Sequence, residues 1–256
     1  MKNLYTLAIS SFAVNGTASL KTFIRILGDK VLPVPSLILN GLTNMGAVRK
    51  LEIDFKELLT SSVELALHRD VELLFYIGYL GNANQANIIC EIIEKYQTKI
   101  KAIIADPVCG DHGRTYVSNE VIAEWPKLIS KADIAFPNIT ELKILTGHDP
   151  SDQLLMDHCV EQFKSKYPKP KLVITSFAQS SDTSGIAVFD NEPFYYTHQD
   201  IPQNYGGTGD ALVAQFILNH FYKLKPFHQA LKEATDQTYL IIKKSFEAGS
   251  KDLLYH

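Results

Sequence analysis

The chain has 256 residues, a mass of 28.7 kDa and a formal net charge of −3. Hydrophobic residues make up 46% of it and charged residues 21%, which is ordinary globular usage and excludes collagen-like, disordered and coiled-coil proteins. The charge balance provides no basic field for a nucleic-acid backbone, and no stretch approaches the ~20 apolar residues of a membrane span. We therefore expect neither a nucleic acid nor a membrane as a partner.

The cysteines and the first residues bear on the compartment. Cys90, Cys109 and Cys159 are scattered, without a C-x-x-C pair, which argues against both a disulfide framework and a structural zinc site. The apolar run that follows Lys2 is shorter than a usual signal-peptide core. These features favour a reducing compartment, and we expect a cytoplasmic protein.

Short apolar runs alternate with amphipathic segments along most of the chain, which indicates α/β architecture with a mostly parallel sheet and helices on both faces. The runs that predict strands are residues 4–9, 31–39, 73–77, 102–105, 133–136 and 171–175. The segments that predict helices are residues 19–27, 55–67, 84–96, 119–130, 139–145 and 151–167.

The pattern changes after residue 180. Residues 184–189 and 193–198 flank Asp190-Asn191-Glu192 in the manner of an antiparallel hairpin, and helices are predicted over 210–222 and 227–247. No linker or repeat interrupts the series, so we expect one domain over residues 1–256. In such sheets ligands bind beyond the carboxyl ends of the strands, which directs attention to the loops that follow strands.

A glycine-rich turn precedes the first of these late helices. Gly207, Thr208 and Gly209 lead into Asp210, and good helix-forming residues follow. Glycines let backbone N–H groups point into one concavity, and the helix start adds its positive dipole end, so the segment predicts an anion hole. A carboxylate at that place repels an anion unless it receives a proton from an incoming nucleophile. The alternative is that Asp210 is simply a helix N-cap.

A second segment, Ala105 to Gly113, directly follows a predicted strand and contains Asp106 and Asp111. Carboxylates at the carboxyl edge of a sheet are able to hold Mg²⁺, directly or through water, and the metal in turn a polyphosphate. The alternative is that Asp-Pro and Gly-Asp-His-Gly are only turn residues.

A third segment, Phe136 to Glu141, also follows a predicted strand. Asn138 and Glu141 are three residues apart and share one helical face. As N-cap and N3 residues they match a capping box, which explains the pair without a ligand.

The order of these three signals resembles the ribokinase superfamily. The chain reads Asp-Pro-Val-x-Gly-Asp from Asp106, Pro-Asn-x-x-Glu from Pro137, and Gly-Thr-Gly-Asp up to Asp210. Together with Gly-Tyr-Leu-Gly from Gly78, the motifs are similar to those of the pyridoxal (vitamin B6) kinases. The resemblance extends over most of the chain, from Ser11 to the last helix.

The resemblance implies a ribokinase-like three-layer sandwich and the ATP-dependent phosphorylation of the 5′-hydroxymethyl group of pyridoxal, pyridoxine or pyridoxamine. ATP and Mg²⁺ would be the cofactors, and the protein would be a homodimer. No covalent enzyme intermediate is expected, because phosphoryl transfer of this kind depends on positioning and charge stabilisation.

The resemblance also assigns roles to individual residues. It implies that Asp210 is the base and that Gly207, Thr208 and Gly209 supply amides to the transferred phosphoryl group. The other roles it implies are Mg²⁺ and phosphate binding by Asp106, Asp111 and Glu141, nucleotide binding by Asn138, Thr175 and Ser176, and substrate binding by Ser11, Thr43 and Tyr79.

Two positions depart from the kinase pattern. Phe136 stands where these kinases commonly have Thr, and residues 39–43 lack the usual His beside the substrate. One alternative is therefore the same chemistry on a hydroxymethylpyrimidine or another small alcohol. A second alternative is a catalytically inactive protein that binds a vitamer.

Overall fold

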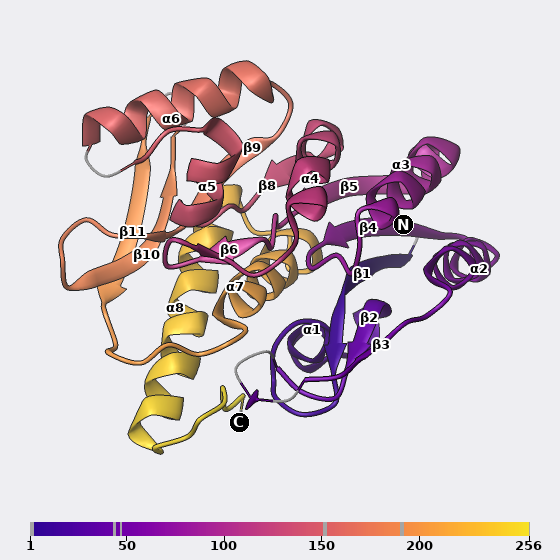
Figure 1. Cartoon of the computed structure of the whole chain (residues 1–256), viewed down its shortest axis with the longest axis horizontal. Helices are drawn as coiled ribbons and strands as arrows, with labels where there is room; N and C mark the ends of the chain where they lie inside the picture. The colour runs from indigo at the N-terminus through magenta and orange to yellow at the C-terminus, as the bar shows by residue number, and fades with distance from the viewer. Residues whose placement is uncertain (1–2, 43–44, 47, 151–152, 190–191, 256) are drawn as a thin grey trace.

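The computed structural model describes residues 3–42, 45–46, 48–150, 153–189 and 192–255. Within these residues the main sheet has nine strands in the order β11-β10-β9-β8-β5-β4-β1-β2-β3 (Figure 1). Their bounds are β1 Asn3–Ala13, β2 Val31–Leu39, β3 Lys50–Leu51, β4 Val71–Ile77, β5 Ile100–Ala105, β8 Ile134–Ala135, β9 Lys171–Phe177, β10 Thr183–Val188 and β11 Phe194–Gln199. The strands from β2 to β9 in this order run parallel, and β3, β10 and β11 are antiparallel to their neighbours.

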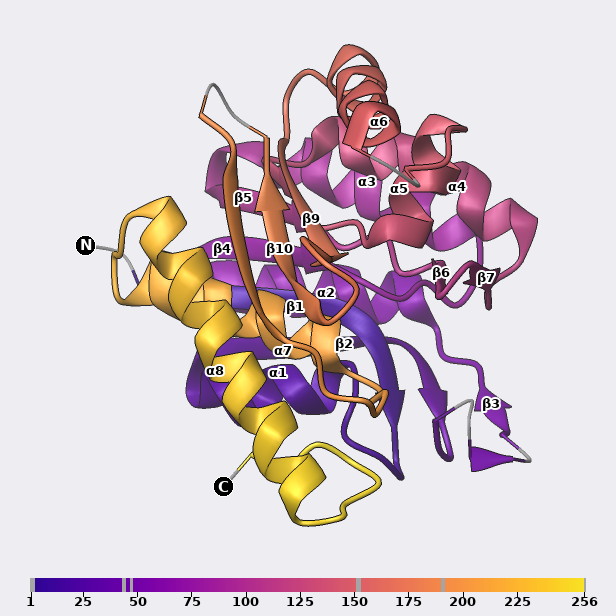
Figure 2. The same ribbon diagram turned by 90° about the vertical axis from the view of Figure 1, so that its left-hand side faces the viewer.

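Helices cover both faces of the sheet, as expected (Figure 2). On one face lie α2 (Phe55–Leu67), α3 (Asn84–Tyr96), α4 (Asn119–Lys131), α5 (Ile139–Thr146) and α6 (Gln153–Lys166), which share one apolar core with the sheet. On the other face lie α1 (Leu20–Leu27), α7 (Thr208–Ile217) and α8 (Phe227–Glu247), which share a second core. The three-layer prediction is confirmed.

Alternation along the central strands separates the two cores, because successive strand side chains point to opposite faces. In β4, Leu73, Phe75 and Ile77 belong to the core under α2–α6. Leu74 and Tyr76 belong to the core under α1, α7 and α8. Strands buried on both faces therefore read as continuous apolar runs, as parallel strands do.

The predicted hairpin is present as β10 and β11, although its turn residues 190–191 lie outside the described part of the chain. Two bounds differ in an informative way. The strand predicted over 133–136 shortens to Ile134–Ala135, just ahead of Pro137, which has no N–H to donate. The helix predicted from 210 starts at Thr208 and becomes a π-helical turn at Leu218–Tyr222.

Across the described residues, every helix is either too short or too polar to cross a bilayer.

Candidate active site

The start of α7 is shaped by a close approach between two distant backbones. Gly207, the N-cap residue, has φ of 92°, and a Cβ built there would lie 2.8 Å from Ala18 Cα. The first intrahelical bond is from Ala211 N–H to the Gly207 carbonyl. The amides of Thr208, Gly209 and Asp210 therefore precede the first helical hydrogen bond, which is the arrangement that an anion site needs.

Asp210 does not cap this helix, so the N-cap alternative is wrong. Its carboxylate instead turns toward the β1–α1 loop, where Oδ2 accepts the Ser19 N–H at 2.8 Å. Oδ1 lies 3.3 Å from the Tyr76 hydroxyl, which donates to it. Burial raises the pKa of Asp210, and the hydrogen bonds from Ser19 and Tyr76 act in the opposite direction. A carboxylate made more basic in this way is suited to accept a proton from an alcohol.

Hydroxyl groups next to Asp210 form a connected chain. Ser19, whose φ of 61° is rare for a serine, has its Oγ 2.7 Å from Ser10 Oγ and accepts a hydrogen bond from Ser11 Oγ at 2.9 Å. Ser10 Oγ also accepts the Tyr79 N–H at 3.1 Å. The predicted substrate residues Ser11 and Tyr79 thus lie within one network beside the candidate base. Thr43 lies outside the described residues.

Asp106, at the carboxyl end of β5, is buried and accepts a hydrogen bond from the Tyr76 hydroxyl at 2.9 Å. Burial and the nearby Asp210 charge raise the pKa of Asp106 to about 8. Burial and the Asp106 charge likewise hold the pKa of Glu141 well above its ordinary value. Three carboxyl groups therefore share a region where negative charge accumulates, which a cation would relieve.

The loop after Asp106 is a tight hairpin between β6 (Gly110–Asp111) and β7 (Arg114–Thr115). His112 and Gly113 form its turn with φ of 48° and 75°. Asp111 is exposed and accepts the His112 N–H at 2.8 Å. Gly113 N–H donates to Thr140 Oγ1, which ties the hairpin to α5.

Asn138 and Glu141 form the predicted capping box at the start of α5. Glu141 Oε2 accepts the Asn138 N–H at 2.9 Å, and Oε1 accepts the Cys109 N–H at 3.1 Å. Asn138 Nδ2 donates to the Gly110 carbonyl at 2.8 Å. Both polar side chains therefore hold the Asp106–Asp111 loop against α5.

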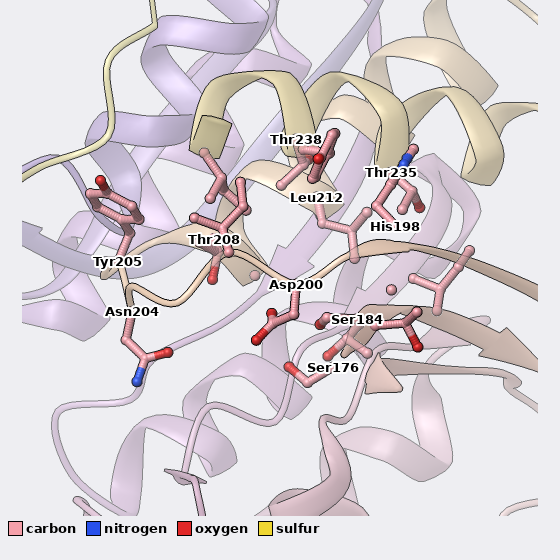
Figure 3. A pocket seen from close by; sticks show the side chains of 18 of the residues that line it. Ser176, Ser184, His198, Asp200, Asn204, Tyr205, Thr208, Leu212, Thr235 and Thr238 are labelled. Atoms are coloured by element: carbon pink, nitrogen blue, oxygen red, sulfur yellow. The ribbon is translucent and has the colours of Figure 1, made fainter. Parts of the chain in front are cut away.

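A cavity of about 500 Å³ opens beside the start of α7 (Figure 3). Thr208 and Gly209 line it together with the predicted nucleotide residues Thr175 and Ser176. Thr235 and Thr238 reach it from α8. Asp111 also lines it, whereas Asp106, Glu141 and Asn138 are not among its lining residues.

Several residues of this region are not predicted from the sequence. Ser19 contributes a main-chain N–H, and Tyr76 lies inside an apolar strand, so neither carries a sequence signal of its own. Thr238 and Tyr205 also line the cavity, and their hydroxyl oxygens are buried without a hydrogen-bond partner within the described structure. The Thr235–Thr238 spacing, three residues apart on one helical face, is the signal that was available.

No three His, Cys, Asp or Glu side chains within the described ranges are gathered so as to hold a metal ion by themselves. Mg²⁺ in nucleotide sites keeps several waters and takes only one or two carboxylates besides the phosphates. Asp111 at the rim of the cavity, with the buried carboxyl groups of Asp106 and Glu141 behind it, is compatible with that mode of binding.

Comparisons with known proteins agree with this geometry. Residues 42–256 match the phosphomethylpyrimidine kinase family. The pyridoxal kinase of Arabidopsis thaliana is 26% identical over 82% of this chain and 72% of its own length. Pyridoxal kinase from Leishmania donovani, solved with ADP and pyridoxamine, has a TM-score of 0.80 and 25% identity, over 98% of this chain and 90% of that one.

A Bacteroides thetaiotaomicron structure is described as a phosphomethylpyrimidine kinase and was solved with pyridoxal. It has a TM-score of 0.82 and 25% identity, over 96% of this chain and 89% of that one. The chain therefore belongs to the phosphomethylpyrimidine kinase family and, within the ribokinase superfamily, to the group that contains the pyridoxal kinases.

Proposed function

We propose that this protein transfers the γ-phosphoryl group of ATP to the 5′-hydroxymethyl group of pyridoxal, pyridoxine or pyridoxamine. The observation that carries the proposal is the position of the Asp210 carboxylate, which accepts the Ser19 N–H at 2.8 Å. Asp210 lies in the first turn of α7 together with Thr208 and Gly209, which line the cavity. A base and a phosphate site are thus combined in one helical turn.

In the proposed reaction, Asp210 accepts the proton of the substrate hydroxyl as its oxygen attacks the γ-phosphorus. The bond from that phosphorus to the β,γ-bridging oxygen breaks, ADP leaves, and the product is a phosphate monoester. Gly207 shapes the turn, and the amides of Thr208 and Gly209 donate to the oxygens of the transferred group, where negative charge must be stabilised.

The nucleotide is proposed to occupy the 500 Å³ cavity, with Thr175 and Ser176 beside its phosphates. Asn138 assists by holding the Gly110 carbonyl, and so the hairpin, in place. Support comes from the ADP in the Leishmania donovani relative.

Mg²⁺ is proposed to be held by Asp111 at the cavity rim, with Asp106 and Glu141 contributing charge from below it. When bound, the ion neutralises charge on the ATP phosphates. The residues fit it, because burial and the charge of a neighbouring carboxylate, Asp210 for Asp106 and Asp106 for Glu141, raise the pKa of both groups, and a cation would offset that repulsion.

The vitamer is proposed to bind on the other side of Asp210, next to Ser11 and Tyr79, with Thr43 completing the site. In the wider setting we propose one kinase domain over residues 1–256 that acts as a cytoplasmic homodimer, as the family resemblance implies.

The family name favours one alternative substrate, a hydroxymethylpyrimidine. The decisive experiment offers the purified chain Mg²⁺, ATP and a panel of pyridoxal, pyridoxine, pyridoxamine, a hydroxymethylpyrimidine and ribose. ADP release is followed by a coupled assay, and the phosphorylated product is identified by mass. We expect turnover of at least one B6 vitamer with kcat/KM above that of the pyrimidine. Turnover of the pyrimidine alone would replace the vitamer assignment, and saturable vitamer binding without product would indicate the inactive alternative.

A further inference from the structure

Tyr76 places one phenolic hydroxyl between two carboxylates of the active site. The hydroxyl donates to Asp106 Oδ2 at 2.9 Å and lies 3.3 Å from Asp210 Oδ1. The three residues come from β4, the end of β5 and the first turn of α7. The Tyr76 side chain is fully buried, so water does not replace this contact.

The arrangement has an electrostatic reason. Two carboxylates close together in a buried site repel each other, and each requires hydrogen-bond donors. Asp210 has the Ser19 N–H on Oδ2, and the Tyr76 hydroxyl is the donor that it shares with Asp106. The shared donor links the carboxylate at the nucleotide side to the proposed base.

The surrounding structure fixes the hydroxyl in place. The Tyr76 ring packs on Phe23 of α1 with a centroid distance of 4.1 Å. A Cβ at Gly78 would lie 2.7 Å from the Tyr76 hydroxyl and 2.9 Å from Ser10 Oγ. The absence of a side chain at Gly78 therefore provides the space in which the hydroxyl reaches both carboxylates.

We propose that Tyr76 is a positioning residue of the kinase reaction: its hydroxyl joins Asp106 to Asp210 and fixes the orientation of the base toward the substrate hydroxyl. This inference rests on the proposed role of Asp210 as the base. A base displaced by a fraction of an ångström loses much of its effect, because the reaction depends on alignment of the reacting atoms.

The first test is Tyr76→Phe, which removes the hydroxyl and keeps the ring on Phe23. We expect kcat to fall about 10- to 100-fold while KM for both substrates changes less than about twofold. The matched control is Tyr222→Phe, which removes a hydroxyl that contacts Thr6 Oγ1 at 2.9 Å and the Lys30 carbonyl at 3.1 Å, away from the site. Its kcat is expected to stay within about twofold of the wild type.

The second test combines Tyr76→Phe with Asp210→Asn. If Tyr76 acts through the base, its removal changes kcat by less than about twofold once the base is gone, because coupled residues are non-additive. An equal loss in both backgrounds, or an unchanged kcat in Tyr76→Phe alone, would overturn the inference. The alcohol used is whichever one the wild type turns over, so a wild type that is inactive on B6 vitamers would count against the proposed function and not against Tyr76.

Gly78→Ala gives a test that leaves Tyr76 in the sequence and pushes its hydroxyl away from the carboxylates. We expect kcat to fall at least about fivefold, because the base would no longer be aligned with the substrate hydroxyl. Should Tyr76→Phe fail to fold, this variant decides the question, and a wild-type kcat in it would contradict the proposal.

Discussion

At the scale of one residue, the surroundings of Asp210 suit its carboxylate to the proposed role of base. Its burial makes the carboxylate more basic, while the Ser19 N–H at 2.8 Å keeps it oriented. A raised pKa lowers the cost of moving a proton from an alcohol to the carboxylate. It also means that, as the pH is lowered, activity should begin to fall at a higher pH than it would if the base were an exposed aspartate.

Asp210→Asn should lower kcat about 10²- to 10⁴-fold and leave vitamer binding nearly unchanged, because the amide keeps the shape but does not accept the proton. Steady-state kinetics with direct binding of the vitamer checks this. Asp29→Asn, a change at an exposed aspartate outside the site, is the control. Near-normal kcat in Asp210→Asn would remove the base assignment.

At this scale the sequence identified candidate residues that stand in short motifs. Asp106 and Asp210 were identified from the loops that contain them, and the structure links them through Tyr76. Ser19 and Tyr76 were not found, because one acts through its main chain and the other stands in an apolar strand. Such contacts depend on residues far apart in the sequence, and a motif does not encode them.

Phe136, which departs from the kinase pattern, has a packing explanation. Its side chain is 1% exposed and its ring lies 5.3 Å from that of Phe216 in α7. The position therefore supports the sheet-to-α7 core and contributes no hydroxyl to the site. The same contact steadies the helix that carries Asp210.

At the scale of elements, the β1–α1 loop and the start of α7 depend on each other. Gly207 approaches Ala18 too closely for a side chain, and its φ of 92° is unfavourable for any L-residue. Both features place the amides at the start of α7 next to the loop whose Ser19 N–H binds Asp210.

Gly207→Ala should therefore lower kcat/KM for ATP at least about tenfold, because the added methyl group displaces the turn by a fraction of an ångström. Gly147→Ala is the matched control: Gly147 has φ of 78° but nothing within 4 Å of its would-be Cβ. The control isolates backbone strain and is expected to cost about 1 kcal/mol of stability without changing kinetics. Equal kinetics in both variants would show that the close approach to Ala18 is unimportant.

The capping box of α5 leads to a second prediction for an element. Glu141 accepts two backbone N–H groups through different oxygens, and glutamine offers only one acceptor oxygen in its place. Glu141→Gln should reduce the free energy of unfolding by about 1–3 kcal/mol and raise the Mg²⁺ concentration needed for activity. Urea denaturation and a Mg²⁺ titration of kcat measure the two effects.

Glu120→Gln, at an exposed position in the first turn of α4, is the control for that change. An unchanged Mg²⁺ titration in Glu141→Gln would restrict Glu141 to a structural role.

Most elements followed from apolar periodicity, because parallel strands and amphipathic helices leave long, regular patterns. The two-residue strands β3, β6 and β7 did not, since two residues have no period. The start of α7 was placed two residues late, because Asp210 resembles an N-cap in sequence while Gly207 takes that position. The order of the strands in the sheet did not follow from the apolar pattern either, because it depends on how the connecting helices pack on the faces of the sheet.

At the scale of the whole molecule, the buried carboxylates make stability depend on pH. The pKa of Asp106 is about 8 in the folded chain, against an ordinary value of 3.8. Between these values the folded chain keeps a proton that the unfolded chain releases. Stability from this group is thus complete at low pH and is lost as the pH rises toward 8.

In the absence of nucleotide and metal, Asp106→Asn should make the protein more stable than the wild type at pH 8, with the difference shrinking as the pH falls to about 5. Urea denaturation at several pH values measures this, with Asp29→Asn as a control. The slope for one group is at most about 1.4 kcal/mol per pH unit. Parallel curves for wild type and variant would refute the expectation.

The hydrogen bond between Ser19 and Asp210 joins positions that are 191 residues apart. A nascent chain of about two hundred residues therefore contains the strands from β1 to β11 but not α7. Such a chain lacks both the turn at Gly207–Gly209 and the carboxylate that accepts the Ser19 N–H. The contact between Ser19 and Asp210 forms only after α7 is synthesised and packs against the β1–α1 loop.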